Sequence, residues 1–238
     1  MTTRENRLWR EMQTALCEAP GVTLQLVENW RDHEGLCWGL LAWLSGEAAS
    51  AHRMRKEALC RASVSLELLW LSQRLQEESP VSGVAGTAGG IRPLEQYRIA
   101  DYLYAKGLSL TAGLPSEVAR EIAEEACRFK ADRLLWNPAE WGEHAALELA
   151  YRKLGRWTAV CCKVGALLGA CEERVREALI QYGFSLGMAV ASDGGSAVLY
   201  RQKALSCLSA LPDGETKSLL RAVPDAFMLG KGRAFLDV

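Results

Sequence analysis

The 238-residue chain lacks several features that would point to particular classes of protein. Its longest apolar run, Trp157 to Cys171, is short and interrupted by Lys163, so we expect no transmembrane segment. Neither charge dominates, since 28 basic and 29 acidic side chains leave a net charge of -1. This balance argues against nucleic acid as a partner, because phosphate binding favours a basic face. Only three histidines occur, and they share no ligand spacing with cysteines, so a structural zinc site is not expected.

The eight cysteines contain no Cys-x-x-Cys pair, and most lie in apolar helical stretches, as small core residues do. The N-terminus, Met1 to Arg10, is polar and charged and does not resemble a secretory signal. We therefore expect a reduced, cytoplasmic protein.

Strand patterns are nearly absent, whereas Ala, Leu, Glu and Arg are frequent, which favours an all-α fold. Pro20-Gly21 and Gly46 are predicted to separate the first helices, and Gly113 to act as a left-handed stop before Pro115. The pattern predicts helices at 4–18, 22–45, 47–78, 94–112, 116–136, 139–153, 156–170, 172–191, 196–210 and 214–222.

One segment, Ser79 to Gly90, is rich in glycine and small residues. No Gly-Lys-Ser/Thr follows it, and it joins a helix to a helix, so it is not interpreted as a phosphate loop. We expect a flexible loop at 79–93 inside one domain that spans residues 1–238, with an N-terminal helix at 1–20 and a tail at 223–238.

Four glycines in the second half are spaced by four residues, which places each pair on one helix face. They are Gly165 with Gly169, and Gly183 with Gly187. Glycine inside a helix costs about 0.5–1 kcal/mol relative to alanine, so these positions predict close helix–helix contacts.

The stretch from Tyr151 to Asp193 combines a tyrosine, a lysine, a Gly-Ala pair and a Tyr-Gly-x-x-x-Gly helix. These elements are Tyr151, Lys153, Gly165-Ala166 and residues 182–187. In that order and spacing they resemble the polyprenyl synthase family, and residues 66–69 (Leu-Glu-Leu-Leu) and 100–103 (Ala-Asp-Tyr-Leu) resemble its upstream motifs.

The resemblance implies one large helical bundle of the isoprenoid-synthase type around a central cavity. It also implies transfer of an allylic diphosphate to isopentenyl diphosphate, with Mg²⁺ held by two aspartate-rich motifs. Magnesium prefers carboxylate oxygens in octahedral geometry and acts as a Lewis acid on the leaving diphosphate.

Both aspartate-rich motifs depart from the family pattern. The first falls at residues 77–81 (Glu-Glu-Ser-Pro-Val), which leaves Glu77 and Glu78 as candidate metal ligands. The second falls at residues 194–198 (Gly-Gly-Ser-Ala-Val), and only Asp193, one position early, carries a carboxylate. We therefore expect no cofactor, and Mg²⁺ only if the chain is active.

The resemblance also assigns candidate diphosphate contacts to Lys153 and Arg92, although the family's Gly-Lys-x-x-Arg-Pro is missing near residues 32–38. Simpler interpretations stand beside each candidate. Glu77 and Glu78 are also typical of a solvated helix end, Lys153 of an exposed basic residue, and Asp193 of a turn.

Because fold-defining small residues persist while charged site residues do not, we expect a non-catalytic subunit of a homo- or heterodimer with an active polyprenyl synthase. The eight tryptophans are consistent with core or interface positions. Two alternatives remain: an active prenyltransferase that uses Glu77 and Glu78, or a protein that binds an isoprenoid or other apolar ligand.

Overall fold

The computed structural model describes residues 3–34, 37–50, 55–78, 93–135, 140 and 142–228, and within these residues all regular elements are helical. The all-α prediction is confirmed. The elements are α1 (Thr3–Ala15), α2 (Gly21–Glu34), α3 (Cys37–Ala49), α4 (Lys56–Glu78), α5 (Pro93–Thr111), α6 (Ser116–Leu135), η3 (Gly142–His144), α7 (Ala145–Ala150), η4 (Tyr151–Gly155), α8 (Arg156–Gly169), α9 (Glu173–Ala191), α10 (Gly194–Cys207), η5 (Leu208–Ala210) and α11 (Glu215–Met228).

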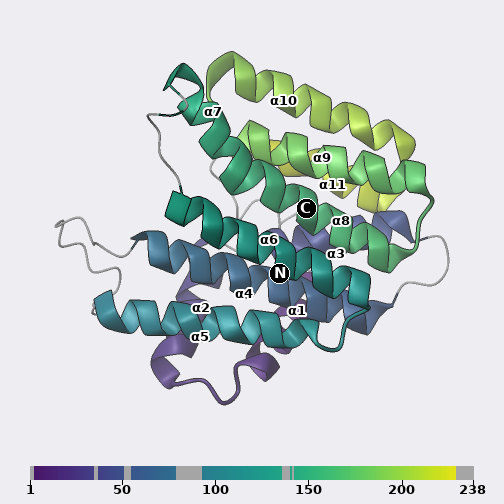
Figure 1. The fold of residues 1–238 in the computed structure, drawn as a ribbon. Helices are drawn as coiled ribbons and strands as arrows, with labels where there is room; N and C mark the ends of the chain where they lie inside the picture. The colour runs from purple at the N-terminus through teal and green to yellow at the C-terminus, as the bar shows by residue number, and fades with distance from the viewer. Residues whose placement is uncertain are drawn as a thin grey trace.

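The helices pack side by side in a bundle (Figure 1). α4 pairs with α5, while α3 packs between α4 and α8. Helices α8, α9 and α10 follow one another outward, so that α10 lies along the upper edge in Figure 1. Apolar side chains from every described α-helix except α7 join in one buried cluster. None of the helices described is long and apolar enough to cross a membrane.

Glycines on both helices allow α3 and α8 to approach closely. The prediction that Gly46 separates two helices is wrong: the residue lies inside α3, which continues to Ala49, and α4 begins only at Lys56. A Cβ on Gly46 would lie 2.7 Å from the Leu59 side chain, and one on Gly165 would lie 2.8 Å from the Gly46 nitrogen. Gly46 is therefore a packing residue rather than a turn residue.

The other paired glycines serve the same purpose. A Cβ on Gly169 would lie 2.6 Å from the Cβ of Ala49 in α3. Gly183 and Gly187 of α9 lie against Thr158 of α8, whose hydroxyl donates to the Gly183 carbonyl oxygen at 2.6 Å. The predicted close helix contacts at all four glycines are confirmed.

Several helix boundaries differ from those predicted. The single helix expected at 22–45 is two helices, because α2 ends at Glu34 and α3 begins at Cys37. The last helix extends past residue 222 to Met228, although Pro224 lies inside it, so residues 223–228 of the expected tail are helical, and residues 229–238 lie outside the described residues. Its apolar face explains this length, since Val223 and Ala226 are buried in the core.

The predicted left-handed stop at Gly113 is also wrong. Gly113 has no positive φ, whereas Ala170, at φ 55°, ends α8 in the left-handed conformation. The predicted break near residue 154 is absent, because α7, η4 and α8 run on as one helix. The loop predicted at 79–93 lies outside the described residues, apart from Pro93 at the start of α5.

Candidate functional site

The C-terminal end of α4 meets the helix formed by α7, η4 and α8, and there two predicted site residues contact each other. The Nζ of Lys153 lies 2.9 Å from Oε1 of Glu77. Arg74, one turn earlier on α4, lies 3.9 Å from the other Glu77 oxygen. The structure therefore brings together the lysine expected to contact diphosphate and the carboxylate expected to hold a metal.

The lysine lies on a π-helical segment, η4, from Tyr151 to Gly155. Short π-helical turns inside α-helices are rare and frequent at functional sites. Here Gly155 permits close packing on α9, since a Cβ there would lie 2.9 Å from Sδ of Met188. The Tyr151 ring packs edge-to-face on Phe184 of α9, with ring centroids 6.1 Å apart.

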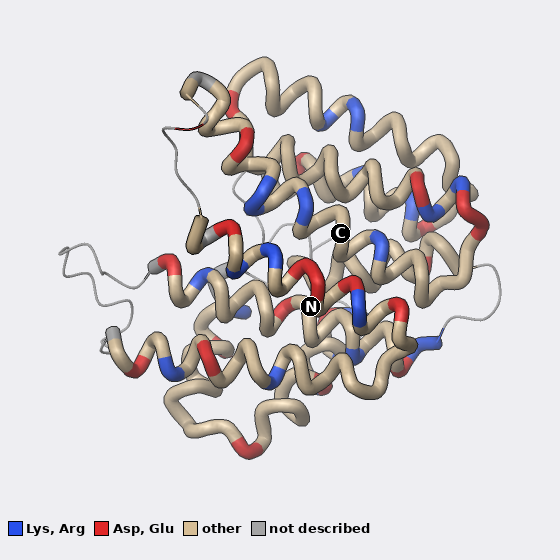
Figure 2. Tube along the Cα trace, in the orientation of Figure 1, with Lys and Arg blue, Asp and Glu red and all other residues tan. Residues whose placement is uncertain are grey.

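Beside this pair, basic residues of η4 and α8 face acidic residues of α6 and α7. Arg152 donates to Asp132 at 2.9 Å and to Glu148 at 2.5 Å. Arg156 lies 2.9 Å from the second Asp132 oxygen and 2.9 Å from Glu125. Figure 2 shows acidic and basic segments alternating along α6 opposite the basic stretch that follows α7.

Glu125 is the most buried member of this network, at 1% exposure. Burial raises the pKa of its carboxyl group above the ordinary value, and the neighbouring Arg156 and Arg128 oppose that rise. The arginine contacts are what make a buried carboxylate tolerable at this position.

Sequence reasoning missed the α6 residues. Arg152 and Arg156 are spaced to share a helix face, which signals a basic stripe. Nothing local, however, indicates that Glu125 and Asp132 of another helix lie opposite. That pairing requires the packing of α6 on α8.

Aromatic rings fill the bundle centre below the Glu77–Lys153 ion pair. Trp70 lies about two turns before Glu77 on α4, and Trp157 about one turn after Lys153 on α8. Their rings are 5.8 Å apart, and Phe129 of α6 lies 6.1 Å and 6.0 Å from them. Trp157 is 1% exposed, so this cluster belongs to the closed core.

Two further rings extend the cluster toward the other side of the bundle. Trp38 of α3 packs edge-to-face on Trp70 at 5.1 Å and stacks on Phe227 of α11 at 5.3 Å. The aromatic cluster, meaning Trp38, Trp70, Phe129, Trp157 and Phe227, thus connects five helices.

Within the described part of the chain, the structure shows no contact between the Glu77–Lys153 ion pair and the other predicted site residues. Asp193 is an exposed residue before α10, with extended backbone and no side-chain cap. Arg92 and the side chain of Glu78 lie outside the described residues.

A magnesium ion needs several oxygen ligands that converge on one point. Among the described residues, no three His, Cys, Asp or Glu side chains gather closely enough to hold a metal ion. Glu77 faces a lysine instead of a second carboxylate. These residues do not fit a magnesium cluster.

No protein-family model and no curated protein sequence matches the chain. Solved structures do resemble it. Heptaprenyl diphosphate synthase from Staphylococcus aureus superposes with a TM-score of 0.79 at 16% identity, covering 95% of this chain and 98% of that one. A polyprenyl synthase from Caulobacter crescentus, complexed with calcium and isoprenyl diphosphate, reaches 0.78 at 14% identity, with 94% of each chain covered.

A third similar structure is the geranyl diphosphate synthase small subunit from Antirrhinum majus, with a TM-score of 0.70, 16% identity, and coverage of 94% of this chain and 100% of that one. The chain has the polyprenyl synthase fold. The predicted fold is therefore confirmed at the level of architecture.

Within this polyprenyl synthase fold, residues 66–69 and 100–103 are the two upstream segments that resemble family motifs. One acidic residue in each segment accepts hydrogen bonds from a neighbouring helix. Oε2 of the buried Glu67 accepts hydrogen bonds from the backbone N–H groups of Trp38 at 2.9 Å and Gly39 at 2.8 Å. It thereby satisfies orphan donors in the first turn of α3. Asp101 of α5 accepts from Gln76 of α4 at 3.1 Å and so supports the end of α4 that carries Glu77.

Proposed function

We propose that the chain is a polyprenyl synthase-like protein of isoprenoid biosynthesis that acts as a non-catalytic subunit beside an active prenyltransferase. One observation carries the proposal: at the end of α4, carboxylates are matched to cations. Glu77 faces Lys153, while Asp132 and Glu125 face Arg156. Ionisation of an allylic diphosphate needs the opposite arrangement, in which converging carboxylates hold metal ions against the diphosphate.

The Glu77–Lys153 ion pair contributes little to the stability of the fold. Its side chains are 24% and 43% exposed, so it is worth only about 0.2–1 kcal/mol. The proposal therefore depends on the absence, among the described residues, of any group of three potential metal ligands, and not on the strength of this pair.

The aromatic cluster supports the same conclusion. A growing prenyl chain needs apolar space beneath the site of ionisation. In this protein Trp70, Trp157 and Phe129 occupy the region between α4, α6 and α8 just below the ion pair. Closely packed rings stabilise the bundle and leave less room for a ligand. This argues against the alternative that the centre binds an isoprenoid.

Association with a second subunit is part of the proposal. One of the similar structures is itself a small subunit of geranyl diphosphate synthase. This chain also exposes large apolar side chains, most strongly Leu134 at 84% and Leu135 at 75% at the end of α6. Exposed apolar side chains of this size are suited to an interface. We further propose that residues 1–238 form one domain, which the core shared by all the described α-helices except α7 supports.

The activity test uses purified full-length protein with Mg²⁺, farnesyl diphosphate and labelled isopentenyl diphosphate. We expect no elongated product. Elongation that disappears in a Glu77→Gln variant would contradict the proposal and favour a prenyltransferase with a reduced metal site. Elongation that survives Glu77→Gln would contradict it as well, and would place the chemistry elsewhere.

The association test co-expresses the chain with an active polyprenyl synthase of the same organism and measures complex mass by light scattering. We expect a mixed complex that a Leu134→Ser, Leu135→Ser variant weakens. Val22→Ser is the matched control, because Val22 is also an exposed apolar residue, at 42%, but lies on α2. Failure to associate at micromolar concentration would overturn this part of the proposal.

A further inference from the structure

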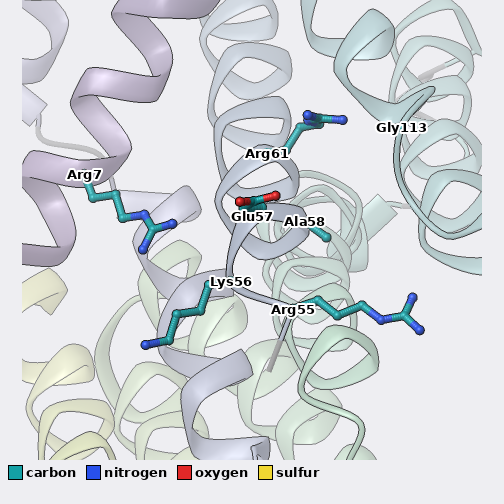
Figure 3. Close-up of a pocket in the computed structure, with 7 residues that line it drawn as sticks. All are labelled: Arg7, Arg55, Lys56, Glu57, Ala58, Arg61 and Gly113. Atoms are coloured by element: carbon teal, nitrogen blue, oxygen red, sulfur yellow. The ribbon is translucent and has the colours of Figure 1, made fainter. Parts of the chain in front are cut away.

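A basic pocket lies at the first turn of α4, far from the Glu77–Lys153 ion pair at its other end. Because α4 contains 23 residues, the two ends are about 33 Å apart. The cavity has a volume of about 680 Å³. Its lining residues come from α1, from the start of α4 and from the turn after α5 (Figure 3): Arg7, Arg55, Lys56, Glu57, Ala58, Arg61 and Gly113.

The pocket concentrates positive charge that other side chains do not neutralise. Four of its lining residues are cations and one is a carboxylate, an excess of three positive charges. Within the described part of the chain, none of these five charged side chains forms an ion pair with another residue. At the opposite end of α4, by contrast, the basic residues of η4 and α8 are each matched to carboxylates.

Backbone N–H groups add to the positive electrostatic potential of the pocket. Lys56, Glu57 and Ala58 form the first turn of α4, where N–H groups have no acceptor within the helix. These groups also carry the positive end of the helix dipole. Together with a lining of cations, they make a favourable environment for phosphate oxygens.

Two of the four cations are held in place by contacts. The Arg61 guanidinium lies directly against Gly113, where a Cβ would overlap with it, and Figure 3 shows this side chain extending toward the Gly113 turn. Arg7 reaches in from α1 and lies over the Trp43 ring, with its guanidinium carbon 5.5 Å from the ring centroid. A guanidinium group that is held in one position can donate two parallel hydrogen bonds to phosphate oxygens. A flexible surface lysine instead binds phosphate as a point charge.

We propose that this pocket binds an anion carrying two or more phosphate groups, and that it is separate from the site at η4. The excess of three charges suits a diphosphate better than a single phosphate, and the volume leaves space for a group attached to it. Such a ligand could arrive as a free diphosphate compound or as a phosphorylated lipid headgroup. This inference does not rest on the proposed function, since it concerns the other end of the bundle.

The test measures binding of inorganic diphosphate to the full-length protein by calorimetry at low ionic strength. We expect a Lys56→Gln, Arg61→Gln variant to bind at least tenfold more weakly. An Arg98→Gln, Arg174→Gln variant has the same change in charge at exposed positions outside the pocket, and should bind within about twofold of the wild type. Lys153→Gln should retain the binding that the Lys56→Gln, Arg61→Gln variant loses, which separates this pocket from the η4 site. If the double pocket variant does not fold by circular dichroism, Arg55→Gln replaces it, because Arg55 is exposed and precedes α4.

Three outcomes would overturn the proposal: no binding of diphosphate at low salt, equal weakening in the pocket and control variants, or loss of binding only in Lys153→Gln. A second arm compares free diphosphate with phosphatidylcholine vesicles that contain phosphatidic acid. Binding to both, with the same dependence on Lys56 and Arg61, would assign the pocket to a lipid headgroup. Binding to diphosphate alone would assign it to a free diphosphate compound.

Discussion

Among single residues, Gly165 is buried and has no room for a side chain. Its missing Cβ would overlap with the Ala42 carbonyl oxygen and lie 2.8 Å from the Gly46 nitrogen, both of which belong to the backbone of α3. Backbone atoms cannot rotate away as a side-chain tip can. Any substitution must therefore push α3 and α8 apart.

We predict that Gly165→Ala lowers the free energy of unfolding by about 2–4 kcal/mol, because the strain exceeds alanine's gain in helix propensity. Urea denaturation measures the difference. Gly195→Ala is the matched control, since nothing lies within 4 Å of a Cβ at that helical position. The control should be neutral or stabilising by up to about 1 kcal/mol. Equal effects at the two positions would contradict the close-contact argument.

Glu67 is a second residue whose contribution follows from its contacts. It is 2% exposed, and one carboxylate oxygen accepts both the Trp38 and the Gly39 N–H groups. We predict that Glu67→Leu destabilises the fold by about 2–4 kcal/mol, because buried donors then lack an acceptor. Glu67→Gln should cost less, since its amide oxygen can still accept.

The unfolding temperatures of Glu67→Leu and Glu67→Gln can be compared with that of Glu172→Leu, which serves as the control. Glu172 occupies the position before α9 but makes no side-chain cap there. It should therefore change stability by only about 0.5 kcal/mol or less. A large effect at Glu172, or none at Glu67, would show that the capping contact is not what stabilises α3.

At the scale of elements, a pair of charges joins α10 to α11. Arg201 donates to both oxygens of Asp225, at 2.5 and 2.9 Å. These hydrogen bonds lower the pKa of Asp225 below its ordinary value. A carboxylate with a lowered folded-state pKa contributes stability above its unfolded pKa and loses it as the pH falls through the folded value.

We predict that Asp225→Asn is less stable than the wild type at pH 7, by no more than about 1 kcal/mol because Asp225 is half exposed. The difference should shrink as the pH falls below about 4 and should vanish once Asp225 is protonated. Urea midpoints measured between pH 7 and pH 3 provide the comparison. A difference that stays constant across this range would contradict an ionic contribution.

For the whole molecule, the aromatic cluster joins five helices at the centre of the bundle. Trp70 contacts Trp38, Phe129 and Trp157, so its ring packs against side chains of α3, α6 and α8. Removing it would leave an apolar cavity at the centre, because closely packed neighbours relax only in part.

We predict that Trp70→Ala lowers the free energy of unfolding by about 3–5 kcal/mol. We also expect the variant to gain affinity for a small apolar probe such as benzene, which raises its unfolding temperature when added. Wild-type protein should show no such rise. A rise of equal size in the wild type would indicate that the centre already has open space, and would favour an apolar-ligand-binding protein.

The sequence by itself determined the helical class, the close contacts at the spaced glycines and the departures from both aspartate-rich motifs. These follow from spacing within one helix or from the residue types at a few neighbouring positions, so local patterns carry them. Only the tertiary structure placed Gly46 against Gly165, Lys153 against Glu77, and Arg156 between Glu125 and Asp132. It also brought Arg7 to the basic first turn of α4. Each of these contacts joins residues that lie far apart in the chain, and their distance in space depends on how whole helices pack.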